Sequence, residues 1–214
     1  MYLIGIDFSI TKPAACVWDS LLNRYHFIGW PRPDHISKSR IDLYRKHGVT
    51  IYDRTDTKNP HQDSSAKMRF AVDNGSYIAR IMFSELEPFL GVNTHISFEG
   101  LSFGSTGDAI LQLSGYKYLL MEKLKEMVYL DNMYTYAPIT LKKTAGCSKK
   151  GLGKNDMIRS FIEENTDFGK SIADNPDLFM KKGDKNYIEL LDDLVDSYFA
   201  MKTMVEKEGL KTFF

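Results

Sequence analysis

The sequence predicts a single α/β domain, residues 1–214, in which helices flank a central mixed sheet of five strands. Three observations favour this fold class. Three short apolar segments follow one another near the N-terminus, strand-like and helical segments then alternate, and a long amphipathic segment comes last. The 214 residues, 43% of them hydrophobic, are enough to bury one sizeable core and too apolar for a disordered chain.

The strand predictions rest on short apolar runs that are bounded by polar residues. Residues 2–6 form an unbroken apolar run ending at Asp7, which is typical of a strand buried on both faces. Residues 14–18 and 25–30 follow with a short polar turn between them, so we expect a three-stranded meander. The remaining two strands are expected at residues 95–98 and 132–136.

Two long helices are indicated by apolar side chains at steps of three and four. Residues 64–86 form the first, with Asp63 or Ser64 available as the N-cap and Pro88 marking the end. The second is expected at about 106–128. Because this helix is apolar on more than one side, it has two surfaces to bury. We expect one of them to pack against a partner subunit.

Two polar segments are predicted to be irregular, the first in part and the second throughout. Residues 31–63 form a surface excursion around a short candidate strand at 49–52, and residues 165–186 have the composition of a loop. The last helix is expected to span about 187–208.

Composition excludes several classes of protein. Lys plus Arg and Asp plus Glu each total 28, so nucleic-acid binding would have to depend on local clusters of charge. No segment approaches the length of a membrane span, and the N-terminus does not resemble a signal peptide. Cys16 and Cys147 are too few and too far apart for a disulfide framework or a cysteine-type zinc site. We therefore expect an intracellular, cytoplasmic protein without a membrane partner.

Acidic residues stand at the C-terminal ends of two predicted strands. Asp7 ends the first strand, and Glu99 ends the strand at 95–98. Ligands gather at the carboxyl ends of strands in an open α/β sheet, so parallel neighbours would direct both carboxylates into one crevice. Taken singly, each acid is more typical of a turn cap or a loop.

The last helix adds four acids on one face. Glu189, Asp192, Asp193 and Asp196 fall at i, i+3, i+4 and i+7. Such a stripe is most often a solvated face, and its like charges destabilise an isolated helix by about 0.2–0.5 kcal/mol per pair. Divalent cations would remove this repulsion, and sites with only oxygen ligands suit Mg²⁺ or Mn²⁺. Two such ions about 3.5–4 Å apart form the usual clamp for attack of water on a phosphodiester.

Four segments resemble, in this order along the chain, the RuvC-type Holliday junction resolvases of the ribonuclease H-like superfamily. They are MYLIGIDFSITKPAACV, ISFEGLSFGSTGDAILQLSGYKYLL, YAPITLKKTAGCSKKGLGKNDMI and DDLVDSYFAM, about a third of the chain. The resemblance implies a ribonuclease H-like fold, a homodimer, and Mg²⁺-dependent nicking of branched DNA such as four-way junctions. Two departures indicate a divergent member, such as a phage or viral one: no glycine closely follows Asp7, and the interval before Glu99 is long.

The resemblance also implies roles for individual residues. The metal ligands would be Asp7, Glu99, Asp193 and Asp196, with Asp192 as the alternative to Asp193, and they would hold two Mg²⁺ ions for which Mn²⁺ can substitute. Lys154 would act near the scissile phosphate, and Phe103 would stack on unpaired bases at the branch point or fill the core.

A basic loop supplies the predicted DNA-binding surface. Its lysines stand among three glycines, which would let the loop follow a phosphate backbone, although a solvated basic loop has the same composition. The predicted DNA-binding lysines are Lys142, Lys143, Lys149, Lys150 and Lys154.

Two other functions remain open on the sequence. A non-catalytic scaffold protein of the actin and ribonuclease H-like folds shares the opening motif, but it would not need Glu99 together with the terminal aspartates. A ribonuclease H-like nuclease acting on RNA–DNA hybrids or flaps would use the same metal site on another substrate.

Overall fold

The computed structural model describes residues 1–101, 107–149, 151–181, 183 and 186–210. Its centre is a six-stranded mixed sheet with the order β4-β3-β2-β1-β5-β6. The first three strands form the predicted antiparallel meander, and β5 pairs in parallel with both β1 and β6. The strands are β1 Tyr2–Asp7, β2 Ala14–Asp19, β3 Arg24–Gly29, β4 Val49–Ile51, β5 His95–Glu99 and β6 Met133–Tyr136.

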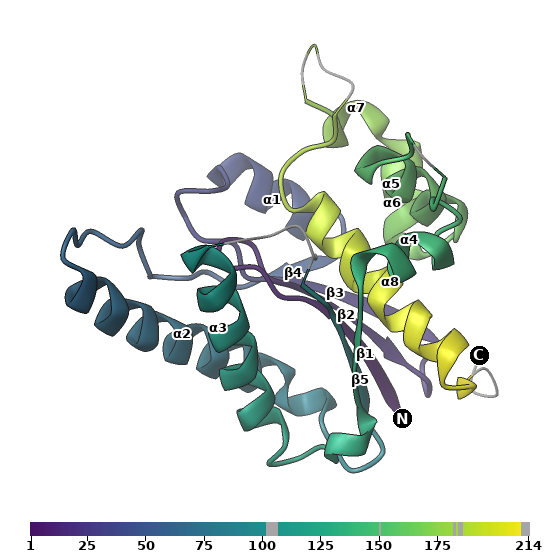
Figure 1. Cartoon of the computed structure of the whole chain (residues 1–214). Coiled ribbons are helices and arrows are strands. Elements are labelled where there is room, and N and C mark those ends of the chain that lie inside the picture. Colours follow the sequence, from purple (N-terminus) through teal and green to yellow (C-terminus); the bar gives the residue numbers. More distant parts are fainter. Residues whose placement is uncertain (102–106, 150, 182, 184–185, 211–214) are drawn as a thin grey trace.

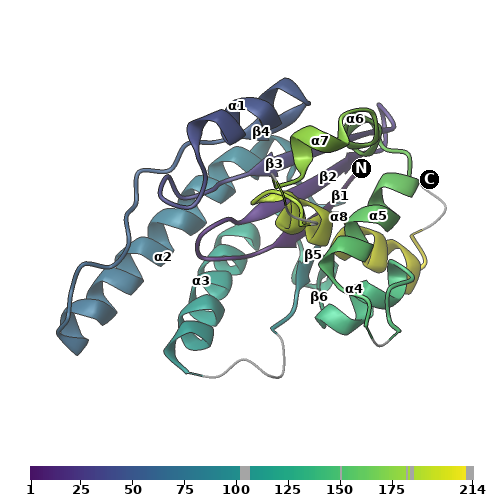
Figure 2. The ribbon, with the colours of Figure 1, turned by 90° about the horizontal axis from the view of Figure 1, so that it is seen from above.

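Helices cover both faces of the sheet, as Figures 1 and 2 show. The long helices α2 (Ser64–Leu86) and α3 (Asp108–Leu124) pack against each other on one face. Helix α8 (Leu191–Lys207) crosses the other face. The remaining helices are α1 Lys38–Lys46, α4 Pro138–Thr144, α5 Lys154–Glu163, α6 Asp167–Asp174, α7 Pro176–Phe179, and the 3₁₀ turns η1 Glu87–Phe89 and η2 Leu130–Asn132. None of the helices within the described ranges combines the length and apolarity needed to cross a membrane.

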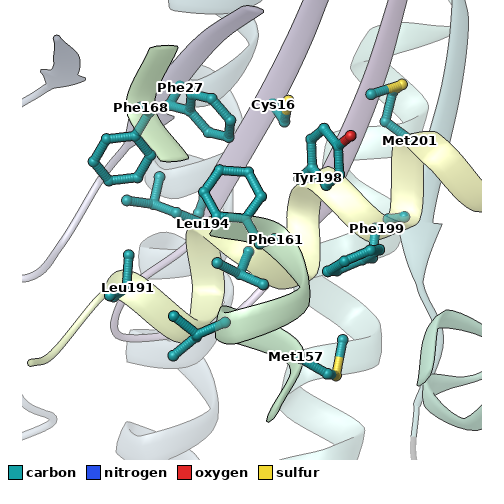
Figure 3. Packing of buried hydrophobic residues seen from close by; sticks show 14 of the residues in the cluster. Cys16, Phe27, Met157, Phe161, Phe168, Leu191, Leu194, Tyr198, Phe199 and Met201 are labelled. Atoms are coloured by element: carbon teal, nitrogen blue, oxygen red, sulfur yellow. The ribbon is translucent and has the colours of Figure 1, made fainter. Parts of the chain in front are cut away.

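Strand β1 is buried on both faces, as its unbroken apolar run predicts. Leu3 packs into the cluster beneath α8, whereas Ile4 and Ile6 pack into the cluster beneath α2 and α3. The α8 cluster is rich in aromatic rings (Figure 3), including Phe161 of α5 and Tyr198 of α8, whose ring centroids are 5.1 Å apart. The sheet therefore separates two cores, one on each face.

Helix α8 lies directly against β1 because residue 5 is glycine. A Cβ atom at Gly5 would lie 2.0 Å from the carbonyl oxygen of Ser197 and 2.5 Å from the backbone nitrogen of Met201. A side chain there would push the helix off the strand. Since alternate residues of a strand share a face, Asp7 lies on the same face as Gly5 and points toward α8.

Within residues 31–63 the structure confirms the candidate strand and adds a helix that was not expected. The candidate strand at 49–52 is β4, which pairs in parallel with β3 at the edge of the sheet, so the sheet has six strands where five were expected. Helix α1 is the unexpected element. Helix α1 is mostly exposed. Tyr44 is its buried anchor, and the Tyr44 hydroxyl donates a 2.7 Å hydrogen bond to the carbonyl oxygen of Glu189.

Two boundaries near the C-terminus also differ from the expectation. Residues 165–186 include α6 and α7 in place of a continuous loop. Helix α8 begins at Leu191, later than the expected 187, because the preceding residues are held in extended pairing. Tyr187 forms a β-bridge with Met180, and the backbone N–H of Ile188 donates to the carbonyl oxygen of Phe179. Glu189 therefore lies outside the helix and forms an ion pair with Lys181 at 3.1 Å.

Candidate active site

The sheet brings Asp7 and Glu99 together as the sequence predicts. Strands β1 and β5 are parallel neighbours with Ile6 opposite Phe98, so the next residue of each strand, Asp7 and Glu99, stands at the same edge. Phe98 packs beneath α2 and α3. Alternation therefore places Glu99, like Asp7, on the face covered by α8.

Helix α8 completes the acidic cluster with Asp196. One carboxylate oxygen from each of Asp7, Glu99 and Asp196 lies within 4.8 Å of the other two. Three elements that are distant in the sequence, β1, β5 and α8, each supply one of these groups. Among the residues that the structure describes, the cluster is formed by these three acids, and Asp193 lies beside it.

Burial and mutual repulsion perturb the protonation of the cluster. Burial and the charges of Glu99, Asp193 and Asp196 raise the pKa of Asp7 well above its usual value. Burial, followed by the charge of Glu99, raises the pKa of Asp196 in the same way. Burial also raises the pKa of Glu99, although the charges of Lys154, Lys117 and Lys142 oppose this rise. The cluster thus carries negative charge that nearby lysines compensate only in part.

The two adjacent aspartates of α8 have different surroundings. Asp193 is buried, with 5% of its surface exposed, and its Oδ2 lies 2.8 Å from the Nζ of Lys12. Burial and the charge of Asp192 raise the pKa of Asp193 to about 7, against the effect of Lys12. Asp192 is more exposed and contacts two lysines, with Lys154 Nζ at 2.6 Å and Lys12 Nζ at 3.4 Å.

These two ion pairs fix the charge state of Asp192. Burial acts against its ionised form, but Lys12 and Lys154 outweigh burial and hold the pKa of Asp192 well below its usual range. Burial likewise disfavours the charged form of Lys154, yet Asp192 raises the pKa of this lysine. Asp192 is therefore an anchor for two lysines.

Two of the predicted DNA-binding lysines, Lys142 and Lys154, lie near the acidic cluster. Lys142 and Lys143 occupy the last turn of α4, Lys149 is exposed in the following loop, and Lys154 is the first residue of α5. Lys150 and Phe103 lie outside the described residues. Lys142 and Lys154 are close enough to Glu99 to influence its pKa, so this basic segment borders the acidic cluster.

Two lysines of the site were not predicted. Lys12 stands in the turn between β1 and β2, five residues after Asp7, and its backbone N–H donates to the Oγ of Ser9. Lys117 of α3 is buried, with its Nζ 3.3 Å from the carbonyl oxygen of Glu99 and 5.5 Å from the centre of the Phe98 ring. The sequence feature that could have identified Lys117 is its position as a single charge on an apolar helix face. Lys12 was the one charge in an otherwise uncharged turn.

The donor set suits a hard divalent cation. Three carboxylates without histidine or cysteine match the all-oxygen coordination of Mg²⁺, Mn²⁺ or Ca²⁺. Oxygens within 4.8 Å of one another can share an ion at the usual Mg–O and Ca–O distances of about 2.0–2.6 Å. Burial first, and the repulsion of neighbouring carboxylates second, raise the pKa values of Asp7 and Asp196, and a bound cation would favour the ionised form of both groups.

Comparison with solved structures identifies the fold. The structure of Thermus thermophilus RuvC matches with a TM-score of 0.51 at 12% identity, over 98% of this chain and 97% of that one. The yeast mitochondrial Holliday junction resolvase Ydc2 matches with a TM-score of 0.50 at 13% identity, over 99% of this chain and 83% of that one. Comparison with protein-family models and with curated protein sequences finds no match.

Both neighbours match over almost the whole of this chain, so the similarity extends beyond the central sheet to its helices. The resemblance inferred from four sequence segments is thereby confirmed at the level of the fold. The chain has the ribonuclease H-like fold of the RuvC-type Holliday junction resolvases.

Proposed function

We propose that this protein is a divalent-metal-dependent endonuclease that resolves Holliday junctions or other branched DNA by paired nicks. The observation that carries the proposal is the convergence of Asp7, Glu99 and Asp196 at one edge of the sheet, in a fold shared with junction resolvases. Lysines from three helices border this cluster. Such a site can hold cations and phosphate side by side.

Each group of the site has a role in this proposal. Asp7, Glu99 and Asp196, with Asp193 beside them, hold two Mg²⁺ or Mn²⁺ ions. When bound, these ions activate water and stabilise the charge that develops on the scissile phosphate. Lys154, exposed at the start of α5, contacts the phosphate near the cut.

The basic segment from α4 to α5 positions the DNA. Lys142, Lys143, Lys149 and Lys150 contact phosphates and hold the backbone against the acidic cluster. Phe103 follows Glu99 closely in sequence and stacks on unpaired bases at the branch point.

A cleavage panel with matched variants tests the proposal. The substrates are a four-way junction, a three-way junction, a flap, an RNA–DNA hybrid and a linear duplex, each with Mg²⁺, Mn²⁺ or EDTA. We expect the wild type to nick junctions with either ion and to be inactive in EDTA. Asp7→Asn keeps the side-chain size but removes a charge, so a loss of about 4 kcal/mol of stabilisation would slow nicking about 1,000-fold. The exposed Asp131→Asn variant is the matched control.

The outcomes of this panel separate the candidate functions. Near-parental nicking by Asp7→Asn in Mg²⁺ would refute the metal-site assignment. Preferential cleavage of the hybrid or the flap would indicate a ribonuclease H-like nuclease with another substrate. Inactivity of the wild type on every substrate with both ions would favour the scaffold alternative.

We further propose that the protein acts as a homodimer through α3. Two matched nicks require two active sites, and a two-fold dimer supplies them with the right symmetry. Leu111 and Tyr118, seven residues apart on one stripe of α3, are 71% and 67% exposed. Helix α2, which packs against α3, adds exposed Met68 and Val72.

Substitution of this apolar stripe tests the dimer. Burying a large apolar side chain contributes about 1.5–3 kcal/mol, and each substitution counts twice across a two-fold axis. Leu111→Ser with Tyr118→Ser should therefore convert the dimer to monomer in sedimentation velocity at micromolar protein. Leu130→Ser, at a site 60% exposed outside the stripe, should leave the dimer intact. A wild type that sediments as a monomer, with and without junction DNA, would contradict the proposal.

A further inference from the structure

Lys12 lies between the two adjacent aspartates of α8. Its Nζ is 2.8 Å from Oδ2 of Asp193 and 3.4 Å from Oδ1 of Asp192. The other oxygen of Asp192 is taken by Lys154 at 2.6 Å. The side chains of Lys12, Lys154, Asp192 and Asp193 thus form one connected quartet beside the cluster of Asp7, Glu99 and Asp196.

The carboxylates of the site are therefore not equivalent toward cations. Asp7, Glu99 and Asp196 share a position where no lysine ammonium is recorded in contact with their carboxylates within the described residues. Asp193 is already paired with the ammonium of Lys12. A divalent ion bound to Asp193 would place a second positive charge next to Lys12, and the two would repel.

The geometry offers Lys12 a second acceptor. Oδ1 of Asp192 is already within 3.4 Å, so a small movement of the side chain would transfer the ammonium from Asp193 to Asp192. The turn itself need not move, because the backbone N–H of Lys12 is held by Ser9.

We propose that Lys12 is a positioning residue that controls the second divalent ion. The first ion binds to Asp7, Glu99 and Asp196 without competition. The second ion needs Asp193 and binds only as Lys12 moves from Asp193 to Asp192. Asp192 is in this scheme the acceptor for Lys12 and not an ion ligand. The inference rests on the proposed metal-dependent function and assigns a role that the acidic cluster alone does not imply.

Direct measurement of Mn²⁺ binding tests this scheme without DNA or turnover. Free Mn²⁺ is followed by electron paramagnetic resonance during titration of the full-length protein at fixed pH. We expect the wild type to bind two ions per chain, the second about tenfold or more weakly than the first. Lys12→Met should tighten the second ion about tenfold and leave the first within about twofold. Lys12→Arg keeps the charge and should behave as the wild type.

Two further variants separate a direct role of Lys12 from a general effect of charge. Lys142→Met removes a lysine that also lies near Glu99 but does not contact Asp193, so it should affect both ions or the first ion alone. Asp192→Asn removes the alternative acceptor and should weaken the second ion. In the double variant Lys12→Met/Asp192→Asn, the second ion should bind as in Lys12→Met alone, because Asp192 acts through Lys12.

Each outcome bears on one of the two proposals. Equal affinity of the two ions in the wild type, or an unchanged affinity for the second ion in Lys12→Met, would refute the role of Lys12 and leave the metal-dependent nuclease standing. A further loss in the double variant would identify Asp192 as an ion ligand and also refute the scheme. A wild type that binds no Mn²⁺ would instead overturn the proposed function itself.

Discussion

We expect the protein to lose stability with rising pH when divalent ions are removed by a chelator, because several aspartates of the site are buried. Burial raises the pKa of Asp193 to about 7 in the folded protein, against an ordinary value of 3.8. The folded state therefore holds a proton over a pH range in which the unfolded state has released it. The free energy of unfolding falls with rising pH wherever the folded state binds more protons than the unfolded state.

The pH window and the magnitude follow from these two values. The stabilisation that comes from protonated Asp193 is fully present below about pH 4 and is lost as the pH rises from there through 7. A difference of about 3 pKa units corresponds to about 4 kcal/mol. Burial raises the pKa values of Asp7 and Asp196 as well, so their contributions act in the same direction. The lowered pKa of Asp192 acts only below about pH 4 and does not affect this range.

Urea unfolding followed by circular dichroism, in EDTA between pH 5 and 8.5, measures the effect. Asp193→Asn should be more stable than the wild type by about 1.5 kcal/mol at pH 5 and by about 4 kcal/mol at pH 8.5. The histidines are common to both proteins, so their titration cancels in the difference. Millimolar Mg²⁺ should restore stability to the wild type at high pH. A difference that stays constant from pH 5 to 8.5 would show that Lys12 keeps Asp193 ionised throughout, and the reasoning would fail.

Three further predictions concern packing and DNA binding. Gly5→Ala should destabilise the fold by about 1–3 kcal/mol or more in thermal unfolding, because its Cβ would clash with the backbone of α8. Tyr44→Phe should cost about 1 kcal/mol, through loss of the hydrogen bond to Glu189; an unchanged melting temperature would contradict this. Lys142→Ala with Lys149→Ala should weaken binding to all DNA sequences and lower the slope of log affinity against log salt by about 0.9 per lost contact. An unchanged slope would leave the loop without phosphate contacts.

The parts of the fold that local patterns determine could be predicted from the sequence. The run before Asp7 has apolar residues on both faces of the strand, and helix 64–86 repeats its apolar residues in register with its turns. Helix α1 escaped prediction because Tyr44 is its buried anchor and the rest of the helix is more exposed, so the sequence carries no clear apolar periodicity there. Strand β4, although only three residues long, matches the candidate strand at 49–52.

The acids of the site were predictable as a group, but their division of roles was not. Successive helical residues are about 100° apart, and both Asp192 and Asp193 lie on the side of Asp196, at i+4 and i+3 respectively. Helical periodicity therefore cannot decide which of them faces the sheet. The contact of Gly5 with Ser197 and Met201 shows which residues of α8 face the sheet. Asp193 lies four residues before Ser197, on the same side of the helix, and therefore faces the sheet as well.

The same contact explains why Asp192 meets lysines. Once the line through Asp193 and Ser197 lies over β1, Asp192 is turned toward the turn after β1 and the start of α5, where Lys12 and Lys154 stand. These partners are 180 and 38 residues away in sequence, so no local pattern could reveal them. The absence of a side chain at residue 5 thus controls, through the seating of α8, which aspartate is buried beside the acidic cluster and which one anchors the lysines.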